Sequence, residues 1–155
     1  MEKQATDTQV QQAATLFKDA WTLAQQDRVE EASRGFLGAA EVVAGDAKIL
    51  VDICSRLISI NYDNEAINIL TTASEHHPES REVWLTLGHA LGKMWQLKLA
   101  IPAYERALEL GSPAANDLLA YADLLFRARR PDEAREAILK ARELGASDPH
   151  TLYLQ

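Results

Sequence analysis

The sequence predicts an all-α protein in which antiparallel helix pairs stack into a solenoid. A 34-residue repeat, apolar residues at helical spacing inside each repeat, and a Leu/Ala/Glu-rich composition with few Gly and Pro lead to this fold class. A fixed period of this length is typical of one supersecondary unit that has been copied and stacked. The repeat is clearest in two series of alanines, Ala66, Ala100 and Ala134, and then Ala73, Ala107 and Ala141.

The repeat frame divides most of the chain into four units, without insertions. We expect these units at residues 13-46, 47-80, 81-114 and 115-148. Residues 1-12 are a polar extension that either precedes or lengthens the first helix, and residues 149-155 begin a truncated fifth helix. This truncation favours a fragment of a longer protein over an uncapped end that pairs with another molecule.

Each unit begins with an expected helix whose fourth, eighth and eleventh residues share one apolar face. The eighth residue is always small, which lets a neighbouring backbone come close. Asp19 stands where the other units have apolar or aromatic residues, so we expect the first helix to be rotated, shifted or partly exposed at the end of the stack. The three places hold Leu16, Ala20 and Leu23; Leu50, Cys54 and Leu57; Trp84, Gly88 and Leu91; and Leu118, Ala122 and Leu125.

A polar stretch and then a second helix follow in every unit. The stretches, at residues 25-28, 61-64, 94-96 and 129-132, predict tight turns. Pro102 is expected near the start of its helix, and Gly111 and Gly145 at helix ends. In the second helices alanines flank one large residue, as in Ala32, Phe36 and Ala39; Ala66, Leu70 and Ala73; Ala100, Tyr104 and Ala107; and Ala134, Ile138 and Ala141.

The third unit resembles the tetratricopeptide repeat family most fully. The resemblance covers residues 13-148. It implies a right-handed α-solenoid of four tetratricopeptide-type repeats, whose first helices line a concave groove, and a non-catalytic protein-protein interaction scaffold as the function. The residues at the family's Trp, Leu, Gly, Ala, Phe and Ala positions are Trp84, Leu87, Gly88, Ala100, Tyr104 and Ala107.

The resemblance also implies which residues of the first helices face the groove. Their apolar members form a stripe that a solvated surface does not need, so we expect the groove to bind an apolar peptide or an amphipathic helix. Alternatively, the apolar stripe is covered by residues 1-12 or by a second copy of the chain in a homodimer. The predicted partner-binding residues are Phe17, Trp21, Lys48, Val51, Asp52, Ser55, Ile58, Glu82, Leu85, His89, Lys93, Asn116, Leu119, Asp123, Phe126 and Arg127.

One ligand class of the family is disfavoured by the groove residues. Modules that hold the C-terminal carboxylate of heat-shock chaperones use Lys, Asn and Arg side chains at fixed groove positions. In this chain a carboxylate would meet two acids instead of a cationic fork. The residues at those positions are Phe17, Trp21, Asp52, Glu82 and Thr86.

Composition and charge restrict the partner further. The chain has 155 residues and a formal net charge of -7, and all of the excess negative charge lies in residues 1-80, which hold 6 basic and 13 acidic residues. This field disfavours nucleic acid and favours a basic partner segment near the N-terminal units, although an acidic solvated surface would look the same. No apolar stretch is long enough to span a bilayer, and the N-terminus has no secretory signal, so we expect a cytoplasmic protein.

The residue types that carry chemistry do not form an enzyme or cofactor motif. Cys54 occupies a packing position, and neither His76-His77 nor His89 has the partners of a metal or catalytic site. Arg127, Arg129 and Arg130 form a basic corner that is either solvated or in contact with an acidic partner. Besides the scaffold, two functions stay open: a dedicated chaperone of a secreted partner, of the bacterial secretion type, and a substrate-recruiting repeat domain of a larger enzyme such as a glycosyltransferase or sulfotransferase.

Overall fold

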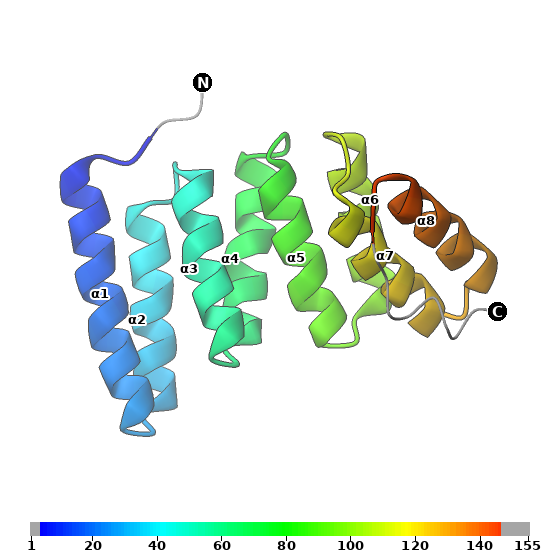
Figure 1. The fold of residues 1–155 in the computed structure, drawn as a ribbon. Coiled ribbons are helices and arrows are strands. Elements are labelled where there is room, and N and C mark those ends of the chain that lie inside the picture. The colour runs from blue at the N-terminus through cyan, green and yellow to red at the C-terminus, as the bar shows by residue number, and fades with distance from the viewer. Residues whose placement is uncertain (1–3, 147–155) are drawn as a thin grey trace.

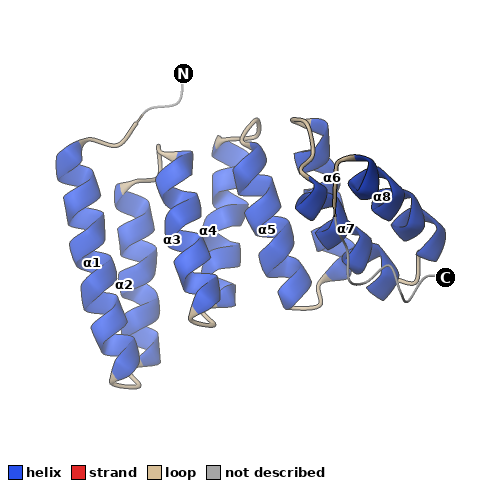
Figure 2. Cartoon of the chain, viewed as in Figure 1, coloured by secondary structure: helices blue, strands red, loops and turns tan. Residues whose placement is uncertain are grey.

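The computed structural model describes residues 4–146, and within this range the chain folds into helices and turns without strands (Figure 2). The predicted all-α repeat fold is therefore confirmed. Four helix pairs stand side by side in chain order (Figure 1). The helices are α1 (Asp7–Gln25), α2 (Val29–Val42), α3 (Ala47–Ser59), α4 (Asp63–His76), α5 (Arg81–Lys93), α6 (Leu97–Glu109), α7 (Ala115–Arg127) and α8 (Pro131–Glu143).

The pairs stack so that the helices form two layers. The first helices of successive pairs touch, with α3 against α5 and α5 against α7, and α2 packs against α4 in the second layer. The stack is held between pairs by α4 against α5 and by α6 against α7. We call the two outer surfaces the first-helix face and the second-helix face. None of the helices within residues 4–146 is long and apolar enough to cross a bilayer.

The core forms at the predicted repeat positions. Leu57, Leu70 and Leu125 are completely buried, as are nearly all of the repeating alanines of the second helices. Phe36 is also fully buried, with its ring centroid 4.9 Å from that of Phe17 and 5.0 Å from that of Tyr62. Asp19 is exposed, which agrees with a partly exposed first helix.

The turns inside the four pairs share one backbone conformation that we did not predict from the sequence. The four residues with positive φ that are not glycine stand 34 residues apart within the described range, with φ between 58° and 63°. In each turn the next backbone N–H donates to the carbonyl of a core leucine five residues earlier, as from Tyr62 to Leu57 at 2.9 Å. The positive-φ residues are Asp27, Asn61, Trp95 and Arg129.

Two expectations about the turns and helix starts need correction. The third turn is not polar, since two of its residues, Met94 and Trp95, are large and apolar, and both are exposed. Pro102 is the sixth residue of α6 rather than part of its first turn, because the turn geometry places the helix start at Leu97. Since Pro102 has no N–H, the carbonyl of Lys98 lacks its usual intrahelical donor.

The N-terminal extension is mostly helix. Thr6 and Gln9 form a capping box at the start of α1, so residues 7–12 belong to that helix and do not cover the groove. The N–H of Ala5 donates to the Asp46 carboxylate at 3.1 Å, and Asp46 also caps α3. At the other end Gly145, with φ 89°, terminates α8 as expected. The predicted fifth helix, residues 149-155, lies outside the described range.

Candidate functional site

The first-helix face contains two adjoining hollows, which together we call the first-helix groove. The hollow between α3 and α5 and the hollow between α5 and α7 each have a volume of about 310 Å³. His89 and Tyr104 line both hollows, so the two adjoin at the middle of α5. His89 is exposed whereas Tyr104 is buried, which gives the groove an open imidazole and an aromatic floor.

The structure brings seven of the predicted partner-binding residues into this groove. Thr86, which was expected on the same face, also lines the first hollow. Ile58 differs from the open side chain that was expected: it is only 8% exposed, because α3 and α5 pack together there. It forms part of the groove wall. The seven residues are Ser55, Ile58, Leu85, His89, Lys93, Asp123 and Arg127.

The other predicted apolar residues do not line the two hollows. Trp21 on α1 is 37% exposed and Phe126 on α7 is 60% exposed, whereas Val51 and Leu119 are half-buried. Phe17 serves mainly in packing, because its ring lies against Phe36 and under the guanidinium of Arg56, 5.9 Å from the ring centroid. The remaining predicted residues are polar and exposed; they are Lys48, Asp52, Glu82 and Asn116.

The two cations in the groove are bonded to the protein itself. Lys93 Nζ donates to the Ile58 carbonyl at 2.8 Å and to Asn61 Oδ1 and Asp63 Oδ2, each at 3.1 Å. Its geometry therefore ties α5 to the end of α3, where the last helical carbonyls need donors. The sequence placed Lys93 correctly on the groove but missed this internal role.

Arg127 repeats this arrangement one helix pair later. Its Nη1 donates to the Gly92 carbonyl at 3.0 Å, and its Nη2 lies 2.7 Å from Asp123 Oδ2. The guanidinium also lies over the Trp95 ring, 5.0 Å from the centroid. Because Lys93 and Arg127 are both engaged, neither offers its full charge to a ligand.

The sequence predicted a close approach at Gly88, but of a backbone rather than the Tyr104 ring, and it did not single out Gly92. Gly88 and Gly92 admit large neighbours from other helices: a Cβ on Gly88 would lie 2.5 Å from Tyr104 Cδ2, and one on Gly92 would lie 2.6 Å from Leu124 Cδ2. Two glycines one turn apart in a helix were the available signal for this close approach. Ala120 also lines the hollow between α5 and α7.

Two titratable groups on the first-helix side, Tyr104 and Cys54, are buried and have raised pKa values. Burial raises the pKa of Tyr104 to about 12, so the phenol remains protonated at neutral pH. Burial likewise raises the pKa of Cys54 to about 12, which leaves its thiol protonated and shielded from reactants. The groove thus combines apolar side chains such as Ile58 and Leu85 with polar ones such as Ser55 and Thr86.

Comparisons with known proteins identify the fold. No protein-family model matches the chain, and no curated protein sequence is similar to it. Similar solved structures have the same tetratricopeptide-like helical-repeat fold, as the sequence resemblance predicted.

Two proteins represent these structures. MamA from Desulfovibrio magneticus RS-1 superposes with a TM-score of 0.65, at 19% identity, over 88% of this chain and 77% of that chain. The type III secretion translocator chaperone SycD from Yersinia enterocolitica, crystallised as an alternative dimer, superposes with a TM-score of 0.60. Its sequence is 20% identical, and the match covers 70% of this chain and 82% of SycD. At these identities the likeness defines the fold alone.

Proposed function

We propose that the first-helix groove binds an apolar segment of another protein, without catalysis. The observation that supports this most directly is the pair of hollows that share His89. Leu85 and Ile58 line one of them, and Trp21 and Phe126, which the repeat frame assigns to the same face, are exposed. Exposed aromatic and aliphatic side chains beside a concave surface are typical anchors for an amphipathic helix or an apolar peptide.

Charge supports a basic partner segment. Asp52 and Glu82 are exposed on the groove side, and within residues 4–146 neither is paired with a cation. Lys48 is also unpaired, so these three residues leave one net negative charge, whereas the charges of Lys93 and Arg127 are compensated by Asp63 and Asp123. Together with the acidic first half of the chain, this field would attract Lys or Arg residues that flank the apolar anchors.

We also propose that the binding surface is organised in four units, at residues 13-46, 47-80, 81-114 and 115-148. The 34-residue spacing of the positive-φ turn residues supports this frame. So does the recurrence of the bond from a cation to a helix-end carbonyl, since Lys93 and Arg127 are also 34 residues apart.

Site-specific photo-cross-linking tests the proposal in cells that express the chain. A photoreactive amino acid in place of His89 should capture a discrete partner, and the same amino acid in place of Leu139, which is exposed on α8, should not. Adding Leu85→Glu should abolish capture at position 89 while the melting temperature stays unchanged. Undiminished capture by the Leu85→Glu variant would contradict groove binding, and a large fall in its melting temperature would show that Leu85 is needed for folding.

A dedicated chaperone of a secreted protein is the second candidate function. The likeness to the SycD chaperone favours it, and an apolar groove on an acidic protein suits a client that aggregates when alone. Co-expression with a secreted protein from the same genome would discriminate: a chaperone keeps its client soluble, and Leu85→Glu removes this effect. A scaffold binds its partner without changing the solubility of that partner.

A further inference from the structure

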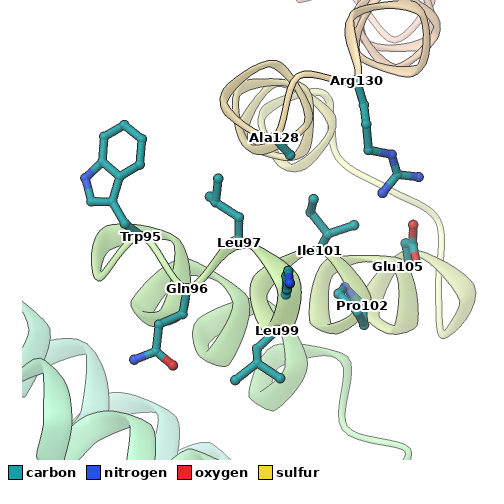
Figure 3. A pocket seen from close by; sticks show the side chains of 10 residues that line it. Trp95, Gln96, Leu97, Leu99, Ile101, Pro102, Glu105, Ala128 and Arg130 are labelled. Atoms are coloured by element: carbon teal, nitrogen blue, oxygen red, sulfur yellow. The ribbon is translucent and has the colours of Figure 1, made fainter.

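A large hollow on the described surface lies away from the first-helix groove. It is a cleft between α6 and the turn that joins α7 to α8, with a volume of about 1030 Å³. In Figure 3, Leu97 and Ile101 point from α6 toward Ala128 on that turn, and Trp95 stands at the start of the helix. A separate hollow between α2 and α4 has a volume of about 280 Å³. We call the larger one the α6 cleft.

The α6 cleft is lined by residues that break the repeat pattern at exposed positions. Trp95, at 67% exposure, occupies the turn position that carries Asp27, Asn61 and Arg129 in the other three pairs. Four residues later Leu99 is 59% exposed. The other pairs carry an acid at this second position, namely Glu31, Glu65 and Glu133. Polar residues have thus been replaced by large apolar ones where nothing in residues 4–146 buries them.

These replacements do not favour the local structure of α6. A tryptophan at φ 58° adopts a left-handed conformation that suits Asn or Gly better. The first turn of α6 contains no acidic residue and instead has Lys98, although the first turns of α2, α4 and α8 all contain acids that complement the helix dipole. Pro102 removes a further helical hydrogen bond. Helix stability therefore does not explain this surface.

The polar rim of the cleft is predominantly cationic. Lys98 lines the cleft and Arg129 lies in the adjoining turn, and within the described range neither forms an ion pair. Arg130 lines the cleft but is bonded to Glu133. The one acid in the lining, Glu105, accepts a hydrogen bond from the Tyr121 hydroxyl at 2.9 Å. Glu105 keeps its negative charge, but the two unpaired cations outnumber it, and with the positive end of the α6 dipole they favour a ligand with carboxylates.

We propose that the α6 cleft is a second docking site, which binds an acidic amphipathic segment of a partner protein. Aromatic or aliphatic side chains of the segment pack on Trp95, Leu97 and Leu99, while its Asp or Glu residues lie against Lys98 and Arg129. This ligand has the opposite charge to the one proposed for the first-helix groove. The two sites therefore select different segments, and one chain can hold both.

Selection from a random peptide library tests this site with short peptides in place of the partner protein. Peptides of about twelve residues displayed on phage are selected on the whole chain, and their affinities are then measured for Trp95→Asn/Leu99→Glu. This double variant restores the residues of Asn61 and Glu65 from the second pair, so it keeps the fold. Leu139→Glu, an apolar-to-acid change on exposed α8, is the matched control.

We expect a group of peptides that combine aromatic or aliphatic residues with Asp and Glu. Their affinity should fall about 30-fold or more in the double variant, as for the loss of an aromatic hot spot, and should not change in Leu139→Glu. Leu85→Glu in the first-helix groove should also leave it unchanged, which separates the two sites. A selection that yields no peptide dependent on Trp95 and Leu99, or only basic ones, would overturn the proposal. So would a lower melting temperature of the double variant, because the two residues would then be structural.

Discussion

The turns of the second and third helix pairs have the same backbone and carry side chains of opposite character. Asn61 and Trp95 both have φ near 60°, and each is in contact with a cationic side chain from the following helix pair. Lys93 donates a hydrogen bond to the Asn61 side chain, whereas Arg127 stacks over the Trp95 ring. Asn61 serves the fold with a polar side chain, while Trp95 keeps the same geometry and exposes an indole.

This difference shows which parts of the repeat are constrained. The buried positions of the third pair follow the pattern closely, with Ala100, Ala107 and Leu91 all in the core. Its exposed positions depart from the pattern at Trp95 and Leu99. Stacking therefore fixes the interior and the backbone of every turn, and it leaves the outer side chains free to acquire a binding function.

The largest loss of stability is expected when a buried side chain of the repeat core is truncated. Phe36→Ala should lower the free energy of unfolding by about 3–5 kcal/mol, since Phe36 is fully buried between Phe17 and Tyr62. Phe126→Ala, at an exposed position, should change it by less than about 0.5 kcal/mol. Urea unfolding followed by circular dichroism measures both. Similar losses in the two variants would mean that Phe126 also belongs to the core.

The next effect concerns the cations that join successive pairs. Lys93→Met should cost about 1–3 kcal/mol, because it leaves the nearly buried Asp63 carboxylate and the Ile58 carbonyl without their donor. Arg127→Met should cost less, since its partner Asp123 is exposed to water. Thermal unfolding of the two variants gives the order. If Arg127→Met were the more damaging change, the contact with Trp95 would matter more than we infer.

The second and third helix pairs also differ in their buried side chains, and a substitution that introduces a clash tests this difference. Gly88→Ala should destabilise the chain by about 1–3 kcal/mol, because the new methyl group would lie 2.5 Å from the Tyr104 ring. Tyr104→Leu, which copies Leu70 of the second pair, should relieve this clash. In a double-mutant cycle the two changes together should therefore cost less than the sum of the single changes. Additive costs would show that the ring moves aside freely.

The smallest predicted change is an increase in stability. Arg129→Asn should raise the free energy of unfolding by about 0.5–1 kcal/mol, because asparagine tolerates φ near 60° better than arginine does. Arg129→Ala keeps the backbone strain and serves as the control, which should give no gain. Chemical denaturation resolves the difference. Equal stabilities for the two variants would indicate that the turn is not strained.

The fold could be predicted from the sequence because the period assigns a facing to each residue. Alanines 34 residues apart located the close helix contacts, and Leu57 and Leu125 were correctly placed in the core. The turn conformation was not predictable from Trp95 or Arg129, since neither residue favours positive φ. It arises from the packing that all four pairs share, which no single residue reveals.

The candidate site was only partly predictable for a related reason. A repeat frame predicts which way a side chain points, but not which hydrogen-bond partners the neighbouring helix pair places beside it. Lys93 and Arg127 therefore looked like contacts for a partner, although helix-end carbonyls engage them. The α6 cleft was missed because residues 94-96 were interpreted as one more polar turn, although two of the three are large and apolar.

The central claim is that Trp95 and Leu99 are exposed for binding and not for stability. Its most direct test is the free energy of unfolding of Trp95→Asn/Leu99→Glu. Losing the stacking with Arg127 should cost about 0.5–1 kcal/mol. Relief of the left-handed conformation and an acid at the start of α6 should each return a similar amount. We therefore predict a stability equal to that of the wild type or up to about 1 kcal/mol higher. A loss of more than about 1 kcal/mol, the usual sign of a residue that holds the fold, would contradict the claim.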